Sequence, residues 1–145
     1  MKFETINQTE SVLPEDGLQD VLDRCVDFFS AEGVMGADQS QCSIYLVFVE
    51  KLKMQELNLQ FRNMDKPTDV LSFAPSEPEF LGELVFCIDV LKLQAMENNH
   101  SIRNEFIYLL IHGLLHLLGY DHENDDDQAK EMLELQDNLF EIVRE

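Results

Sequence analysis

The chain has 145 residues, of which 45% are hydrophobic, and this predicts one compact domain over residues 1–145 with a sizeable core. A formal net charge of −19 argues against broad, nonspecific nucleic-acid binding, because like charges repel. The three cysteines, Cys25, Cys42 and Cys87, form no Cys-x-x-Cys pair, so we expect buried thiols in a reducing compartment rather than disulfides. No secretory signal and no membrane-spanning run is recognisable, so we expect a cytoplasmic protein.

The first predicted element is an amphipathic helix over residues 15–32, where apolar residues recur every three or four positions and Gly33 can end the helix. Residues 43–49 are apolar on both alternating faces, which is typical of a central strand covered on two sides. A short helix is expected over residues 54–61, and Pro67 blocks its continuation.

Two further strands are predicted over residues 69–73 and 81–88, separated by a loop that contains two prolines. Residues 101–118 predict a long buried helix with Ser101 as its cap. The intermixed strands and helices indicate an α/β (α+β) fold, with a small mixed sheet of about four strands packed against about five helices.

The last predicted element is a C-terminal helix that begins after Asp125. Gln128 follows three residues later, so the two side chains resemble a capping box. Spacing of three and four residues predicts that its inner face consists of Ala129, Met132, Leu139, Phe140 and Val143.

Three of the four histidines lie close together near the end of the long helix. His112 and His116 are four residues apart, so both imidazoles can project from one helical face and share a divalent cation, although such a pair can also be packed or at the surface. Gly119 can end the helix and let the chain bring His122 back as a third ligand. Three imidazoles leave one position open on Zn²⁺, as in catalytic sites, and Ni²⁺ or another divalent metal also suits these ligands.

Gly113 occupies the position where zinc proteases of the His-Glu-x-x-His type carry their general base. Its presence argues against peptide hydrolysis by that route. A zincin-type metal site at the end of the helix could still hydrolyse another substrate, because a bound metal can make water nucleophilic without a neighbouring carboxylate.

The segment 112–122, HGLLHLLGYDH, resembles the signature of the YbeY family, bacterial metal-dependent endoribonucleases of ribosomal RNA maturation. A second segment, Leu57 and Asn58 with Arg62 and then 65–73, DKPTDVLSF, is similar to another part of that family. The expected order of elements also agrees with the family's α/β fold.

This chain departs from the family pattern at Glu83, where the family commonly has aspartate after glycine. Four basic side chains could form a local basic strip on the acidic protein, or could simply lie on the exposed face of an amphipathic helix. They are Lys51, Lys53, Arg62 and Lys66.

The resemblance implies a zinc-dependent endoribonuclease, specific for single-stranded RNA, that processes the 3′ end of 16S rRNA in late small-subunit maturation and ribosome quality control. His112, His116 and His122 would bind one zinc ion, with His116 and Arg62 as catalytic residues. Arg62 would also bind the substrate phosphate through paired hydrogen bonds. The implied partners are single-stranded rRNA, the small ribosomal subunit and its assembly factors, without a membrane. A noncatalytic assembly factor with a structural metal and a zincin-type hydrolase of another substrate remain alternatives.

Overall fold

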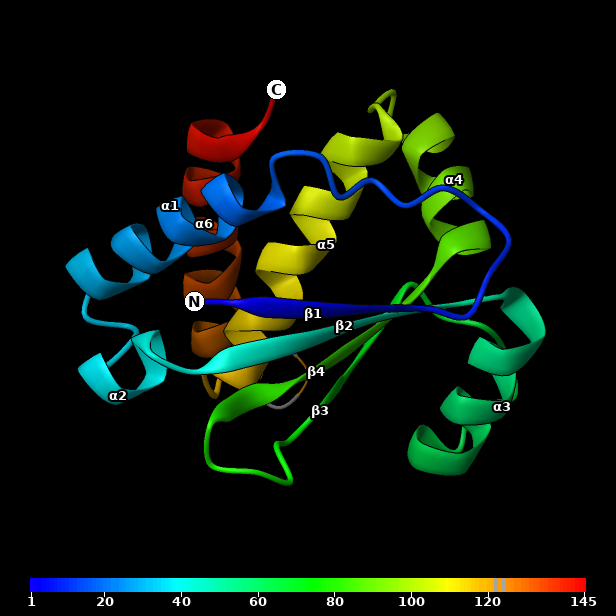
Figure 1. Cartoon of the computed structure of the whole chain (residues 1–145), viewed down its shortest axis with the longest axis horizontal. Helices are drawn as coiled ribbons and strands as arrows, with labels where there is room; N and C mark the ends of the chain where they lie inside the picture. Colours follow the sequence, from blue (N-terminus) through cyan, green and yellow to red (C-terminus); the bar gives the residue numbers. More distant parts are fainter. Residues whose placement is uncertain (122, 124) are drawn as a thin grey trace.

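A computed structural model describes residues 1–121, 123 and 125–145. The sheet has four strands in these ranges, in the order β1-β2-β4-β3 (Figure 1). They are β1 (Phe3–Asn7), β2 (Ser43–Val49), β3 (Val70–Phe73) and β4 (Phe80–Cys87). The first three strands in that spatial order run parallel, and β3 is antiparallel to β4 at the edge of the sheet. The predicted small mixed sheet is confirmed.

Six helices complete the part of the chain that the structure describes, compared with about five expected, and one of them, α2, is a single short turn. They are α1 (Leu18–Ala31), α2 (Ala37–Ser40), α3 (Lys51–Arg62), α4 (Ile88–Glu97), α5 (Ile102–Leu117) and α6 (Asp126–Val143). None of the described helices is long and apolar enough to cross a membrane.

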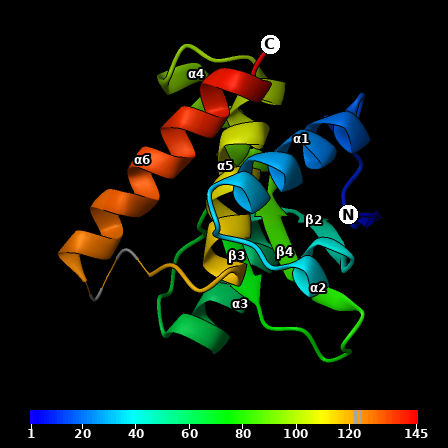
Figure 2. The same cartoon turned by 90° about the vertical axis from the view of Figure 1, so that its left-hand side faces the viewer.

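The central strand β2 is buried on both sides, and this explains why both its faces are apolar. Ile44, Leu46 and Phe48 join the large core that also contains buried residues of α1, α5 and α6. The alternate residues Val47 and Val49 pack with Met54 of α3 in a smaller cluster. Figure 2 shows α1, α5 and α6 grouped together and α3 apart from them. The predicted central strand covered on two sides is therefore confirmed.

The helix α5 begins as predicted, because the Ser101 hydroxyl oxygen accepts a 3.0 Å hydrogen bond from the Asn104 amide. Most of its residues before the last turn are buried. Its carboxyl end places His112 and His116 beside the antiparallel strand pair β3 and β4. The buried helix α5 thus carries the two histidines of the candidate site.

The capping box predicted at the start of α6 is only half correct. Asp125 Oδ1 accepts a hydrogen bond from the Gln128 amide at 3.1 Å, as expected. The Gln128 side chain, however, accepts from the Asp121 amide at 2.9 Å. Its amide oxygen therefore ties the preceding segment to the helix. On the inner face of α6, Ala129 is only half-buried, while the unpredicted Gln136 is buried.

Cys25 and Cys87 are buried free thiols, as predicted, and Cys42 is half-buried. Burial raises the pKa of the Cys25 thiol to about 12. This thiol stays protonated at neutral pH and behaves as a small apolar core residue.

Candidate functional site

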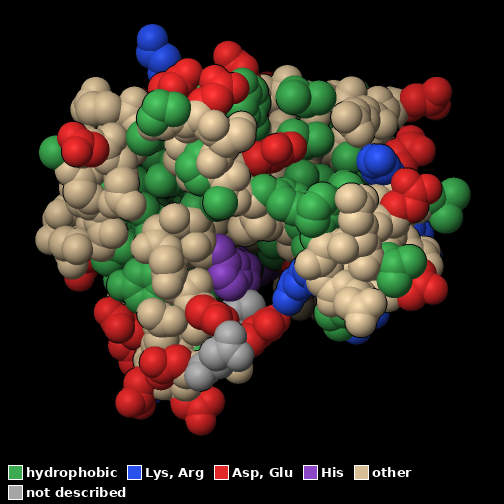
Figure 3. Space-filling view, turned by 90° about the horizontal axis from the view of Figure 1, so that it is seen from below, with side chains coloured by type: hydrophobic (Ala, Val, Ile, Leu, Met, Phe, Trp, Pro, Cys, Tyr) green, Lys and Arg blue, Asp and Glu red, His purple; other side chains and the backbone are tan. Residues whose placement is uncertain are grey.

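A pocket of about 1030 Å³ lies at the carboxyl end of α5, between the end of α3, the edge strand β3 and the segment after α5. Figure 3 shows histidine side chains recessed in a hollow, with basic and acidic side chains nearby. The polar and aromatic side chains that line the pocket are Asn58, Phe61, Arg62, Lys66, Thr68, Asp69, Ser72, Phe73, His112, His116, Tyr120, Asp121 and Glu123.

The two helical histidines meet in this pocket. His112 Nε2 and His116 Nε2 are 3.0 Å apart, and the ring planes are nearly perpendicular at 81°. Two nitrogens bound to one tetrahedral zinc ion at 2.0–2.1 Å would be about 3.3 Å apart. The observed separation is close to this value, so the pair fits two ligands of one small cation.

The turn after α5 fixes the orientation of His116. Gly119 has a φ of 103°, and the amides of Gly119 and Tyr120 donate to the carbonyls of His116 and Leu115. This is a Schellman ending, which favours glycine because other residues rarely adopt such a φ. It turns the Tyr120 carbonyl back to within 3.0 Å of His116 Nδ1. A carbonyl can only accept, so Nδ1 carries the proton, and in the neutral ring Nε2 presents its lone pair.

His112 is oriented in the same sense from another helix. Its Nδ1 lies 3.2 Å from Oε1 of Gln136 on α6. Hydrogen bonds from the distal ring nitrogen to an oxygen acceptor are the usual support of metal-binding histidines. The residues present therefore fit a divalent cation. His122, the third predicted ligand, lies outside the described residues, and within them no cluster of three potential ligands occurs.

The structure gives a physical reason for Gly113 between the histidines. A Cβ atom at this position would lie only 2.7 Å from Leu84 Cδ2 of β4. The helix lies against the sheet here, and the side-chain position faces the core rather than the pocket. A glutamate at residue 113 would not fit without displacing Leu84, so this chain cannot use that position for a general base.

Arg62, the last residue of α3, reaches the same pocket although it is fifty positions before His112 in the sequence. Its Nη2 is 2.6 Å from Glu123 Oε1, and both side chains are partly exposed. The ion pair crosses the pocket from α3 to the segment after α5. The structure thus brings the predicted phosphate-binding arginine to the predicted metal-binding pair.

The proposed basic strip divides into two parts. Arg62 and Lys66 line the pocket, whereas Lys51 and Lys53 lie on the first turn of α3 and do not. Asn58, buried in α3, donates from Nδ2 to the Lys66 carbonyl at 2.8 Å. This bond fixes the turn that carries Lys66 beside the pocket. The position of Lys66 is therefore determined by the buried side-chain amide of Asn58 rather than by helical spacing.

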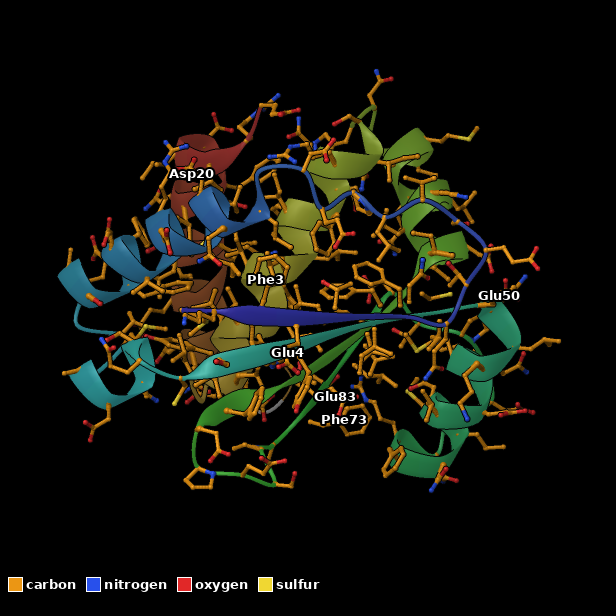
Figure 4. All side chains as sticks on the ribbon, in the orientation of Figure 1. Phe3, Glu4, Asp20, Glu50, Phe73 and Glu83 are labelled. Atoms are coloured by element: carbon orange, nitrogen blue, oxygen red, sulfur yellow. The ribbon has the colours of Figure 1, made fainter. Side chains whose placement is uncertain are left out.

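Glu83, the departure from the family pattern, faces away from the histidines. It pairs with Phe73 across the strands β4 and β3, and both side chains line a smaller groove of about 270 Å³ beside α3. Figure 4 labels the two residues on these neighbouring strands. Its carboxylate therefore takes no part in the histidine pocket.

Sequence reasoning missed Gln136 as a site residue. Its spacing of four residues from both Met132 and Phe140 places it on the inner face of α6, where a polar side chain needs a buried partner. That position within an apolar stripe was the available signal.

Comparisons with known proteins identify the family of this chain. The family model described as "Endoribonuclease YbeY" matches residues 3–144. A protein named "Endoribonuclease YbeY" from Bdellovibrio bacteriovorus is 38% identical over 143 residues, covering 99% of this chain and 95% of that protein. One of the same name from Acinetobacter baumannii is 45% identical over 103 residues, covering 65% of each chain. The solution structure of TM1509 from Thermotoga maritima has a TM-score of 0.66 and 32% identity, covering 97% of this chain and 88% of that one. The chain belongs to the YbeY endoribonuclease family.

Proposed function

We propose that this chain is a metal-dependent endoribonuclease that cleaves single-stranded RNA in the pocket at the end of α5. The observation that carries the proposal is the convergence of His112 Nε2 and His116 Nε2 at 3.0 Å in a pocket that Arg62 also lines. The relatives named endoribonucleases support the choice of RNA as substrate.

His112, His116 and His122 would hold one Zn²⁺ ion, or Ni²⁺ or another divalent ion in a given preparation. Such an ion, when bound, supplies Lewis-acid chemistry that polarises a phosphoryl oxygen and makes water more acidic. The Tyr120 carbonyl oxygen lies 3.0 Å from Nδ1 of His116, and Gln136 Oε1 lies 3.2 Å from Nδ1 of His112. The protein's contribution is therefore a rigid pair of nitrogen ligands on a buried helix.

Arg62 would bind the scissile phosphate and offset the charge that develops on it. Its guanidinium is planar and can hold two phosphate oxygens at once. In the structure it is paired with Glu123, and both groups are partly exposed. Exposed ion pairs of this kind contribute only about 0.2–1 kcal/mol, so an RNA phosphate can displace the carboxylate.

The pocket lining favours an unpaired strand. Phe61, Phe73 and Tyr120 line it, and Phe61 is 56% exposed. Aromatic faces can stack with splayed-out bases, which single strands offer and duplexes do not. This composition supports single-strand specificity.

The net charge of −19 repels free RNA, which supports a substrate that a partner brings to the enzyme rather than one that the enzyme binds from solution. We therefore place the reaction on the small ribosomal subunit in the cytoplasm, during processing of the 3′ end of 16S rRNA and in ribosome quality control. Assembly factors of that subunit would be the partners that overcome the repulsion.

The proposal is tested with a labelled RNA that copies the 3′ end of 16S rRNA, presented free, annealed to its complement, and within isolated small ribosomal subunits. We expect the zinc-loaded protein to cleave the unpaired RNA at least about 10-fold faster than the duplex, since only unpaired bases can reach aromatic side chains. Cleavage of neither unpaired form would contradict the proposal and favour a noncatalytic assembly factor.

A further inference from the structure

Gln136 is a buried amide on the apolar face of α6. Its side chain belongs to a residue only 3% exposed, surrounded on that face by Met132, Leu139, Phe140 and Val143. An amide at such a position is destabilising unless its oxygen and nitrogen are hydrogen-bonded. The partners of Gln136 should therefore explain why a polar residue is present.

Gln136 has two hydrogen-bond contacts with α5. Its Nε2 donates to the Tyr108 carbonyl at 3.2 Å, and its Oε1 lies 3.2 Å from His112 Nδ1. A carbonyl oxygen can only accept, so the amide nitrogen must face Tyr108 and the amide oxygen must face His112. The contact with Tyr108 thus fixes which end of Gln136 reaches the histidine.

This orientation determines the tautomer of His112. An amide oxygen accepts hydrogen bonds and cannot donate, so His112 Nδ1 must carry the proton. In the neutral ring Nε2 then presents a lone pair, and it points at His116 Nε2, 3.0 Å away. The Tyr120 carbonyl fixes His116 in the same tautomer. When both rings are neutral, their two nitrogen lone pairs face each other, and a cation bound between them would stabilise this arrangement.

We propose that Gln136 is a positioning residue that holds His112 in the Nδ1-protonated tautomer and so prepares its Nε2 for a metal ion. The role of Gln136 in metal binding rests on the proposed metal site, whereas the tautomer of His112 can be observed without metal. Helix α6 thereby contributes to the site, although no α6 side chain lines the pocket.

The test compares Gln136→Met with Tyr108→Phe. Methionine is similar in size to glutamine but cannot accept the hydrogen bond from Nδ1. Tyr108→Phe removes a different contact between α5 and α6, the 3.1 Å hydrogen bond from the Tyr108 hydroxyl to Asp137 Oδ1. It therefore controls for weakened helix packing, because it leaves the partners of His112 unchanged.

Two readouts are needed: ¹⁵N NMR of the histidine ring nitrogens in metal-free protein at a pH where His112 is neutral, and the zinc Kd from competition with a chelator. We expect the wild type and Tyr108→Phe to show Nδ1-protonated His112 and equal zinc affinity. Gln136→Met should show a mixture of tautomers and bind zinc about 10–100-fold more weakly, the usual loss when a partner that orients a metal-binding histidine is removed.

The inference would be overturned if Gln136→Met and Tyr108→Phe showed the same populations of His112 tautomers and the same zinc Kd. If Gln136→Met does not fold, the wild-type spectrum alone decides, since Nε2-protonated His112 would contradict the assignment. A wild type that binds no zinc but shows the expected tautomers would refute the proposed metal site. The effect of Gln136 on the tautomer of His112 would still stand.

Discussion

Replacement of His116 by alanine is expected to weaken zinc binding by more than about 100-fold and to reduce RNA cleavage by at least the same factor. The reason is that His116 Nε2 supplies one of the two converging nitrogens at 3.0 Å. Groups that merely orient metal-binding histidines already contribute about 10–100-fold, so removal of a ligand should exceed that range. Chelator competition and single-turnover cleavage measure the two effects.

His100→Asn is the matched control for His116→Ala. His100 lies outside the pocket, and its Nδ1 is 2.9 Å from Oε2 of the buried Glu105. Asparagine retains a hydrogen-bond donor for that carboxylate. We expect wild-type cleavage from His100→Asn. Equal cleavage by His116→Ala and the wild type, purified identically, would show that the activity does not come from this site.

Replacement of Arg62 by glutamate is expected to lower kcat/KM for RNA cleavage by about 10²–10³-fold, the loss typical when one preorganised electrostatic contact with the transition state is removed. Arg62→Lys should retain part of the activity, because lysine keeps the charge but cannot form the paired hydrogen bonds. Zinc affinity should stay unchanged in both variants, since Arg62 belongs to α3 and pairs with Glu123 rather than with the histidines. Single-turnover cleavage with chelator competition separates these effects.

Glu123→Gln is the companion variant with the opposite expected sign. It removes the carboxylate that competes with phosphate for Arg62 Nη2. An exposed ion pair contributes about 0.2–1 kcal/mol, so kcat/KM should rise by up to about 5-fold. A parallel loss of zinc affinity and cleavage in Arg62→Glu would contradict the separate roles of arginine and metal.

The histidine pair could be predicted because its signal is local. Residues four apart on a helix share a face whatever the rest of the fold does, and Gly119 marks the end of that helix. The proximity of Arg62 could not be derived from spacing. It depends on how α3 and β3 are placed around the end of α5, and only the family resemblance indicated it.

Three elements were not predicted, β1, the four-residue helix α2 and α4, and all have weak local signals. The strand β1 is at the edge of the sheet, pairs only with β2, and exposes Glu4 and Ile6. The helix α4 follows β4 without a loop, so the apolar run continues to Ile88 and the predicted strand extended one residue too far. A single sequence shows no boundary where an apolar strand leads directly into an apolar helix.

Gln136 shows a different limit of sequence reasoning. Its position in the buried stripe of α6 follows from helical spacing. That it contacts His112, twenty-four residues earlier, follows only from the packing of α6 against α5. Helical periodicity thus predicts which side chains are buried, and tertiary packing determines which partners satisfy them.

The metal requirement is decided by the cleavage rate of the labelled 16S rRNA 3′ end, free and within small ribosomal subunits, by chelator-treated wild-type protein as zinc is added back in steps. We expect no cleavage by the metal-free protein and a rate that rises to a plateau at about one zinc ion per chain, because the histidines form one site. Full-rate cleavage by metal-free protein, or no cleavage at any zinc concentration, would contradict this expectation.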